Sequence, residues 1–185
     1  MFKLRQLGFT LIEMLLVVAI ITAIVAYGFR QYQLYQWRME AYKVSQGAAY
    51  LLQGLNSYYY QNCAQIPELQ EGHEYKMSLE AFKEQNRDKS KDGNYLPIKL
   101  VNAIYNPWAE KKAQPFDELI LQPVKDKDDK AKVFGYRLEV TATLDEKHAK
   151  ISGIENGLNA ASHKDNTFTW MRLPNQEIKG MNSGM

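Results

Sequence analysis

The sequence has few of the residues that build most chemical sites. It holds a single cysteine, Cys63, so no disulfide can form within the chain. Its three histidines, His73, His148 and His163, lack the close spacing of metal ligands. A glycine-rich phosphate loop and the signature of an activated nucleophile are also missing. We therefore expect no enzyme activity, no cofactor and no metal, and we predict that the histidines lie in solvated loops.

Formal charge is almost absent from one long stretch near the start of the chain. Between Phe9 and Phe29 the only charged side chain is that of Glu13. A helix of this length spans about 31 Å, which is enough to cross the core of a bilayer. A carboxylate at that depth costs on the order of 3 kcal/mol, so it needs a functional reason. The stretch is predicted to span a membrane and to carry a functional glutamate.

The basic residues beside this stretch predict its orientation. Lys3 and Arg5 precede it and Arg30 follows it. Positive charge on the short leading side favours a cytoplasmic N-terminus. The rest of the chain is then expected on the far side of the membrane.

Residues 6–14 read Gln-Leu-Gly-Phe-Thr-Leu-Ile-Glu-Met, after a short basic leader and before an apolar helix. This segment resembles the prepilin leader of type IV pilins and of the pseudopilins of type II secretion. The resemblance implies that a prepilin peptidase cuts after Gly8 and that Phe9 becomes the methylated N-terminus. It also implies that Glu13 offsets the terminal amine of a neighbouring subunit and sets the axial register. Its partners would be other pilin subunits and the inner-membrane assembly platform.

Three other interpretations of the apolar segment compete with this one. A secretory signal would have its apolar core at residues 14–27 and would be cleaved after Ala26-Tyr27-Gly28. An uncleaved signal anchor fits the hydrophobicity equally well. Both leave Gly8, Phe9 and Glu13 unexplained. A buried helix of a soluble protein would need a larger apolar partner than the remaining chain offers.

The helix is predicted to continue beyond the membrane, from about Phe9 to Tyr60. Apolar residues recur there at spacings of three and four, which predicts one buried stripe. This stripe consists of Leu34, Trp37, Ala41, Val44, Ala48, Leu51, Leu52, Leu55 and Tyr59. A second stripe, Tyr32, Tyr35, Met39 and Tyr42, suits a membrane interface or helix packing, and a core-facing position is predicted for most of it. Gly47 and Gly54 allow either close approach or local bending.

The remaining residues predict one small head domain. Strict alternation from Phe134 to Leu144 predicts a strand with one buried face, and a hairpin partner is expected at Ala149–Ile154, ended by Asn156-Gly157. Thr167–Leu173 is expected to form another strand, and Leu119–Val124 a weaker one, with Pro123 at an edge or an end. The expected fold class is α+β. The resemblance implies a pilin-like form of it, in which the amphipathic half of the helix packs against a small antiparallel sheet.

The sequence patterns and the resemblance together imply four segments. They are a leader at 1–8 that is removed, a transmembrane or filament-core half of the helix at 9–29, an amphipathic half at 30–60 and a globular head at 61–185. The polar end of the head, residues 174–185, is expected to be a mobile tail.

Charged segments within the head are predicted to be solvated connections. Lys83–Asn94 and Lys125–Lys132 both mix acidic and basic residues. Asp126, Asp128 and Asp129 suggest calcium, but interleaved lysines oppose a cation and the central glycine of a calcium loop is missing. Asn106-Pro107-Trp108 faintly resembles a turn of major pseudopilins, and a buried Trp at a turn explains it adequately.

Departures from the family pattern suggest a minor pilin. Abundant pilins usually carry two cysteines in the head and often a helix-kinking Pro where this chain has Arg30. A pseudopilin of type II secretion is the alternative role, and a tip pilin that captures DNA is a second one. Removal of residues 1–8 lowers the formal net charge from +2 to 0, so nothing argues for DNA binding. The expected location is the inner membrane with the head in the periplasm, followed by a surface pilus or a periplasmic pseudopilus.

Overall fold

The structure is a computed structural model, and it describes residues 11–87, 95–102, 104–111, 114–127, 129, 132–151 and 154–174. The chain divides into two units, Met1–Met39 and Glu40–Met185. The described residues of the first unit form the beginning of a long helix. The second holds the rest of that helix and the head.

The long N-terminal helix predicted from the sequence is confirmed as α1, Leu11–Asn62. No proline interrupts this segment, so every backbone N–H after the first turn can reach its acceptor. At the far end the Asn62 side chain donates to the carbonyl of Tyr58 at 3.0 Å, and the N–H of Cys63 donates to that of Tyr59 at 2.8 Å. Pro67 then begins α2, Pro67–Gln70, because its fixed φ suits a first helical position.

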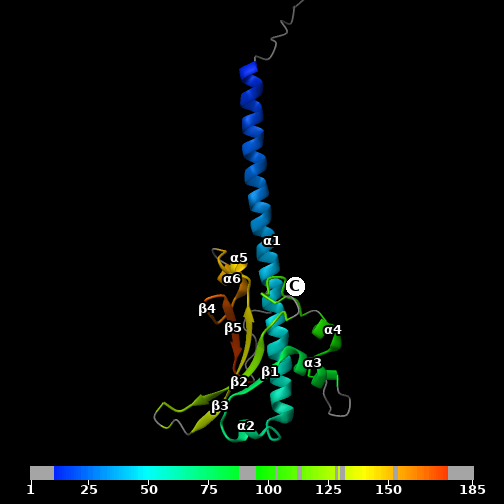
Figure 1. Cartoon of the computed structure of the whole chain (residues 1–185), viewed down its shortest axis with the longest axis vertical. Coiled ribbons are helices and arrows are strands. Elements are labelled where there is room, and N and C mark those ends of the chain that lie inside the picture. Colours follow the sequence, from blue (N-terminus) through cyan, green and yellow to red (C-terminus); the bar gives the residue numbers. More distant parts are fainter. Residues whose placement is uncertain are drawn as a thin grey trace, which may run out of the picture. The chain divides into compact units, whose positions relative to one another are not determined.

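Five antiparallel strands form one sheet in the second unit, in the order β1-β2-β3-β5-β4 (Figure 1). The strands are β1 Tyr75–Ser78, β2 Glu118–Lys125, β3 Val133–Thr143, β4 Ser162–Lys164 and β5 Thr167–Arg172. Short helices connect them: α3 Leu79–Arg87, α4 Ile98–Asn102, α5 Glu146–Ala149 and α6 Ile154–Leu158. This arrangement confirms the α+β class and the pilin-like combination of a long helix with a small sheet.

The core of the head lies between the sheet and residues 40–62 of α1, which run beside it in Figure 1. On β3 the buried side chains are those of every second residue, Tyr136, Leu138, Val140 and Ala142. On α1 the buried residues are Ala41, Val44, Gly47, Ala48, Leu51, Leu52, Gly54, Leu55 and Tyr58. Each fully buried Leu contributes about 1.5–3 kcal/mol, so this interface holds the head on its helix.

Two glycines of α1 mark close approach and not bending. A Cβ at Gly54 would lie 2.7 Å from Cζ of Phe82, which is fully buried on α3. A Cβ at Gly47 would lie 3.3 Å from the ring of Phe116. Helix α1 therefore needs glycine at 54 so that α3 can pack against it.

Three predicted strands are confirmed, as β3, β5 and β2. The prediction for Pro123 also holds. Strand β1 pairs only with Glu118–Leu121, so beyond Leu121 this side of β2 is an edge and needs no N–H donor at Pro123.

The predicted hairpin at Ala149–Ile154 is wrong. Asp145 caps a helical turn instead, because its side chain accepts from the N–H of His148, and α5 and α6 follow. Ile154 and Leu158 are buried, four residues apart on one face of α6, which is helical and not extended spacing. Asn156-Gly157 therefore lies inside α6, and the neighbour of β3 on this side is β5.

The prediction of a solvated connection at Lys83–Asn94 is wrong for its first part. Residues 83–87 belong to α3, whose buried side chains Leu79, Phe82 and Asn86 recur at helical spacing. The strands β1 and β4 had no sequence prediction, because they are only four and three residues long. Residues 88–94, Asp128 and the expected tail from residue 175 onward lie outside the described residues.

Candidate membrane and assembly segment

The first part of α1 exposes an apolar surface along its whole described length. Every side chain from Leu11 to Gln31 is exposed, among them Leu11 at 81% and Ile24 at 65%. Among the described residues, α1 is the one helix long and apolar enough to cross a membrane, and none of its apolar window is buried. An apolar surface of this extent needs a lipid or protein environment, because water disfavours it.

Glu13 lies in the first turn of α1 as the structure describes it, and its side chain is exposed. A carboxylate there complements the amides and the dipole at the start of the helix. The neighbours of Glu13 in sequence are aliphatic. Any lipid or protein that covers these aliphatic side chains will therefore also enclose the Glu13 carboxylate. Gly8 and Phe9, the other two predicted site residues, lie outside the described residues.

The second stripe on α1 corrects the sequence prediction. Tyr32, Tyr35, Met39 and Tyr42 are 57%, 60%, 43% and 56% exposed, so none of them faces a core. The residues that do face the core begin at Ala41 and lie on the other side of the helix. The membrane-interface or helix-packing role predicted for them stays a prediction.

A turn in the head joins several elements around one tryptophan. Asn106 is buried, and its side chain accepts from the N–H of Trp108 at 3.0 Å and donates to the carbonyl of Pro115 at 2.8 Å. The indole N–H of Trp108 donates to Glu40 on α1 at 3.0 Å. The predicted buried Trp at a turn is confirmed.

His148 packs against this turn, so the prediction of solvated histidines is wrong for it. Its ring stacks on Trp108 with the centroids 5.3 Å apart, and its Nδ1 lies 2.7 Å from Oδ1 of Asp145. Partial burial opposes ionisation of Asp145, but hydrogen bonds from the backbone and ring of His148 outweigh it and lower the pKa of that carboxyl. The sequence did contain a signal for this arrangement, because Asp145 and His148 are three residues apart, as an N-cap residue and the N–H that it accepts from are.

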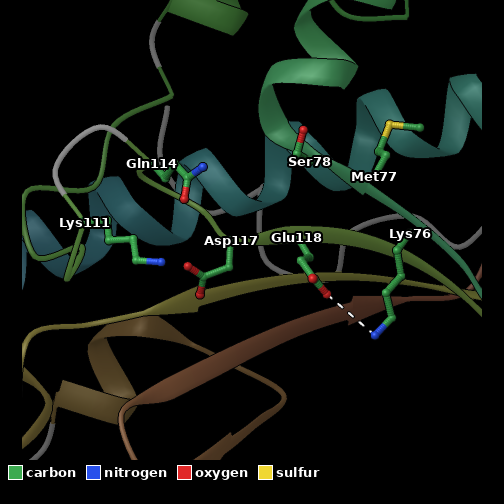
Figure 2. A pocket seen from close by; sticks show the side chains of 7 residues that line it. All are labelled: Lys76, Met77, Ser78, Lys111, Gln114, Asp117 and Glu118. Atoms are coloured by element: carbon green, nitrogen blue, oxygen red, sulfur yellow. Dashed lines mark ion pairs between the residues drawn. The ribbon is translucent and has the colours of Figure 1, made fainter.

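A surface hollow of about 440 Å³ lies between the start of β2, strand β1 and the segment before β2 (Figure 2). Lys76 bridges Glu74 and Glu118 at 3.3 and 3.7 Å, and the hydrogen bond to Glu74 raises the pKa of its ammonium. Asp117 accepts from the hydroxyl of Thr143 at 2.8 Å. Lys76 and Glu118 are thus paired with each other, and Asp117 is paired with Thr143.

The described part of the chain contains no cluster of three His, Cys, Asp or Glu side chains that could hold a metal ion. Asp126 closes the β2–β3 turn through its N–H, which donates to the carbonyl of Lys132 at 2.9 Å. Cys63 is a free thiol of intermediate exposure, one residue beyond α1. Within the described residues, the extended apolar surface is that of the first part of α1.

Residues 3–28 match the family model of the prokaryotic N-terminal methylation motif. The prepilin-type leader predicted from residues 6–14 is thereby confirmed, and the match extends over the exposed start of α1. No curated protein and no solved structure matches the chain. A leader of this type supports a type IV pilin-like protein, implies processing by a prepilin peptidase and assembly with other pilin subunits, and fits anchoring in the inner membrane.

Proposed function

We propose that this chain is a structural subunit of a type IV pilus, in the role of a minor pilin, and that it is not an enzyme. The observation that carries the proposal is the methylation motif at residues 3–28, which extends over the first part of a helix that is apolar and exposed. A subunit that passes from a bilayer into a filament needs one surface that suits both environments. The exposed aliphatic part of α1 is such a surface, while residues 40–62 of α1 pack against the head.

In this proposal a prepilin peptidase cuts between Gly8 and Phe9, and Phe9 becomes the methylated N-terminus. The new terminus carries a positive charge close to the start of α1. In a bundle of apolar helices an unpaired charge is costly, whereas a charge pair is tolerated. The carboxylate of Glu13 is therefore placed to offset the terminal amine of a neighbouring copy and so to select one axial register.

The segments follow from the same proposal. Residues 1–8 are removed, residues 9–29 cross the inner membrane and later enter the filament core, and the head at 61–185 lies in the periplasm before assembly. The single Cys63 and the Arg30 in place of a kinking Pro support a minor and not an abundant subunit. The partners are other pilin subunits and the inner-membrane assembly platform.

A pseudopilin of type II secretion is the second candidate, and the turn at Asn106-Pro107-Trp108 favours it. Asn106 and Trp108 are buried in this turn, and the Asn106 side chain bonds the N–H of Trp108 and the carbonyl of Pro115. Cells lacking the gene separate the two roles. Loss of surface pili indicates the pilus, and loss of protein secretion with pili intact indicates the pseudopilus.

The mass of the mature N-terminus tests the proposal most directly. The chain is isolated from membranes of cells with and without the prepilin peptidase. We expect it to start at methylated Phe9 only when the peptidase is present. A chain that retains Met1 in both strains, or that starts at Phe29, would contradict the proposal.

Substitution of Glu13 tests its proposed role. Glu13→Gln keeps the size of the side chain and removes its charge, and Glu13→Asp keeps the charge. We expect the Gln variant to be cleaved normally but to enter filaments at a tenth of the wild-type level or less, and the Asp variant to enter better than Gln. Equal incorporation of all three chains would show that the charge does not set the register.

A further inference from the structure

An aromatic stripe follows the apolar part of α1 and is unpacked in the structure. Tyr32, Tyr35 and Met39 are 57%, 60% and 43% exposed. They are spaced by three and four residues, so they share one face of the helix. The three side chains form a continuous strip within the first unit.

The composition of α1 changes where this strip begins. From Leu11 to Ala26 the exposed side chains are mainly aliphatic, whereas the next turns bring Tyr27, Phe29, Arg30 and three glutamines. Leu11–Phe29 spans about 28 Å as a helix, close to the roughly 30 Å of a hydrocarbon core. With that segment inserted, residues from about Tyr27 to Tyr35 lie at the level of the lipid headgroups.

The chemistry of these residues suits that level. A tyrosine ring is apolar along its body and polar at its hydroxyl, and tyrosine is enriched at membrane–water interfaces for this reason. Arg30 carries a guanidinium group, which binds phosphate through paired hydrogen bonds. If this surface of α1 served only to contact another aliphatic helix, its side chains beyond Ala26 would also be aliphatic.

We propose that Tyr27, Tyr32 and Tyr35, with Arg30, form an interfacial belt that binds phospholipid headgroups and fixes the depth of α1 in the bilayer. The inference rests on the proposed function, since it concerns the subunit in its membrane-inserted state before assembly. The occupant of this surface is the headgroup layer of the outer leaflet. The belt opposes sliding of the helix in either direction, because each ring would move into hydrocarbon or into water.

The depth of one engineered cysteine tests the belt. Cys63→Ser removes the native thiol, and Leu34→Cys places a probe among the belt residues of the full chain. The protein is reconstituted in vesicles of phosphatidylethanolamine and phosphatidylglycerol, and its labelling rate with a membrane-impermeant maleimide is measured. Tyr32→Ser/Tyr35→Ser is expected to change that rate at least threefold. Tyr32→Trp/Tyr35→Trp is expected to leave it within about 1.5-fold, because tryptophan suits the interface equally well.

Gln33→Ser/Gln36→Ser is the matched control, and its rate should equal that of the parent. If the two Tyr→Ser changes leave the rate unaltered, the belt does not fix the depth and the proposal is wrong. If they leave the rate unaltered but abolish entry into filaments, the stripe serves contacts between copies instead, which also overturns it. Extraction of the parent chain from vesicles by alkaline carbonate would instead refute membrane anchoring, and with it the proposed function.

Discussion

The indole N–H of Trp108 donates a hydrogen bond to Oε2 of Glu40 at 3.0 Å, across 68 positions of sequence. Trp108 is 2% exposed, its carbonyl accepts from the N–H of Asp145, and its ring stacks on His148. One side chain thus joins α1 to the turn at 106–108 and to the segment that follows β3. Because Glu40 and Trp108 both belong to the second unit, this bond ties α1 to the head within that unit.

Removal of the Glu40 carboxylate should destabilise the head. Glu40→Ala leaves the buried indole N–H without an acceptor, which costs about 1–3 kcal/mol of unfolding free energy. Glu40→Gln keeps an acceptor and should cost less than about 1 kcal/mol. Urea unfolding of the full chain in detergent, followed by tryptophan fluorescence, gives both values. Glu80→Ala, an exposed helical Glu, is the control. Equal losses for Ala and Gln would show that the hydrogen bond contributes little.

Alanine at position 54 should destabilise the head although it favours helix. The gain from helix propensity is about 1 kcal/mol, but a Cβ 2.7 Å from Phe82 overpacks the core by about 1–3 kcal/mol. We expect Gly54→Ala to lower the unfolding free energy, and Gly47→Ala, with 3.3 Å of separation, to lower it less. The double variant Gly54→Ala/Phe82→Leu should lose less unfolding free energy than the sum of the losses of the two single variants. Full additivity would contradict the clash.

Removal of the Tyr136 hydroxyl should alter both stability and its dependence on pH. The hydroxyl donates to the carbonyl of Leu69 at 2.6 Å, so Tyr136→Phe should cost about 1 kcal/mol at neutral pH. Burial raises the pKa of Tyr136 above its ordinary 10.0, and the neighbouring Tyr59 adds to this. The folded state therefore retains a proton that the unfolded state loses, and stability falls as pH rises above about 10.

The Phe variant has no such proton, so its stability should fall less steeply between pH 9 and 11. Urea midpoints over this range test the prediction against the wild-type chain. Parallel curves for the two proteins would show that Tyr136 ionises equally in both states.

The variant Asp145→Asn should be less stable than wild type near neutral pH, and this difference should disappear in acid. The hydrogen bonds from His148 hold the pKa of Asp145 below its ordinary 3.8, so its charge stabilises the fold above that pH and this contribution disappears as pH falls through the lowered pKa. Asp145→Asn keeps a capping oxygen but not the charge. We expect the variant to be less stable than wild type at pH 6 and to approach it near pH 3. A constant difference across this range, measured by urea unfolding, would contradict the assignment.

Local patterns were enough to predict the long helix and the strand β3. The spacing of Ala41, Val44 and Ala48 repeats with the turn of a helix, and the alternation around Leu138 repeats with the pleat of a strand. The methylation motif is equally local, since a peptidase reads adjacent residues. Short elements such as β4 carry too few residues for a pattern to emerge.

The sequence by itself determined the leader, the apolar segment with Glu13 and the α+β class, because each depends on neighbouring residues or on their periodicity. Only the tertiary structure decided which faces are covered. It left Tyr32 and Tyr35 exposed, it stacked the half-buried ring of His148 on Trp108, and it made residues 146–149 helical. The physical reason is that burial is a property of two surfaces, and the surface opposite a residue is supplied by chain far away in sequence, as Glu40 is for Trp108.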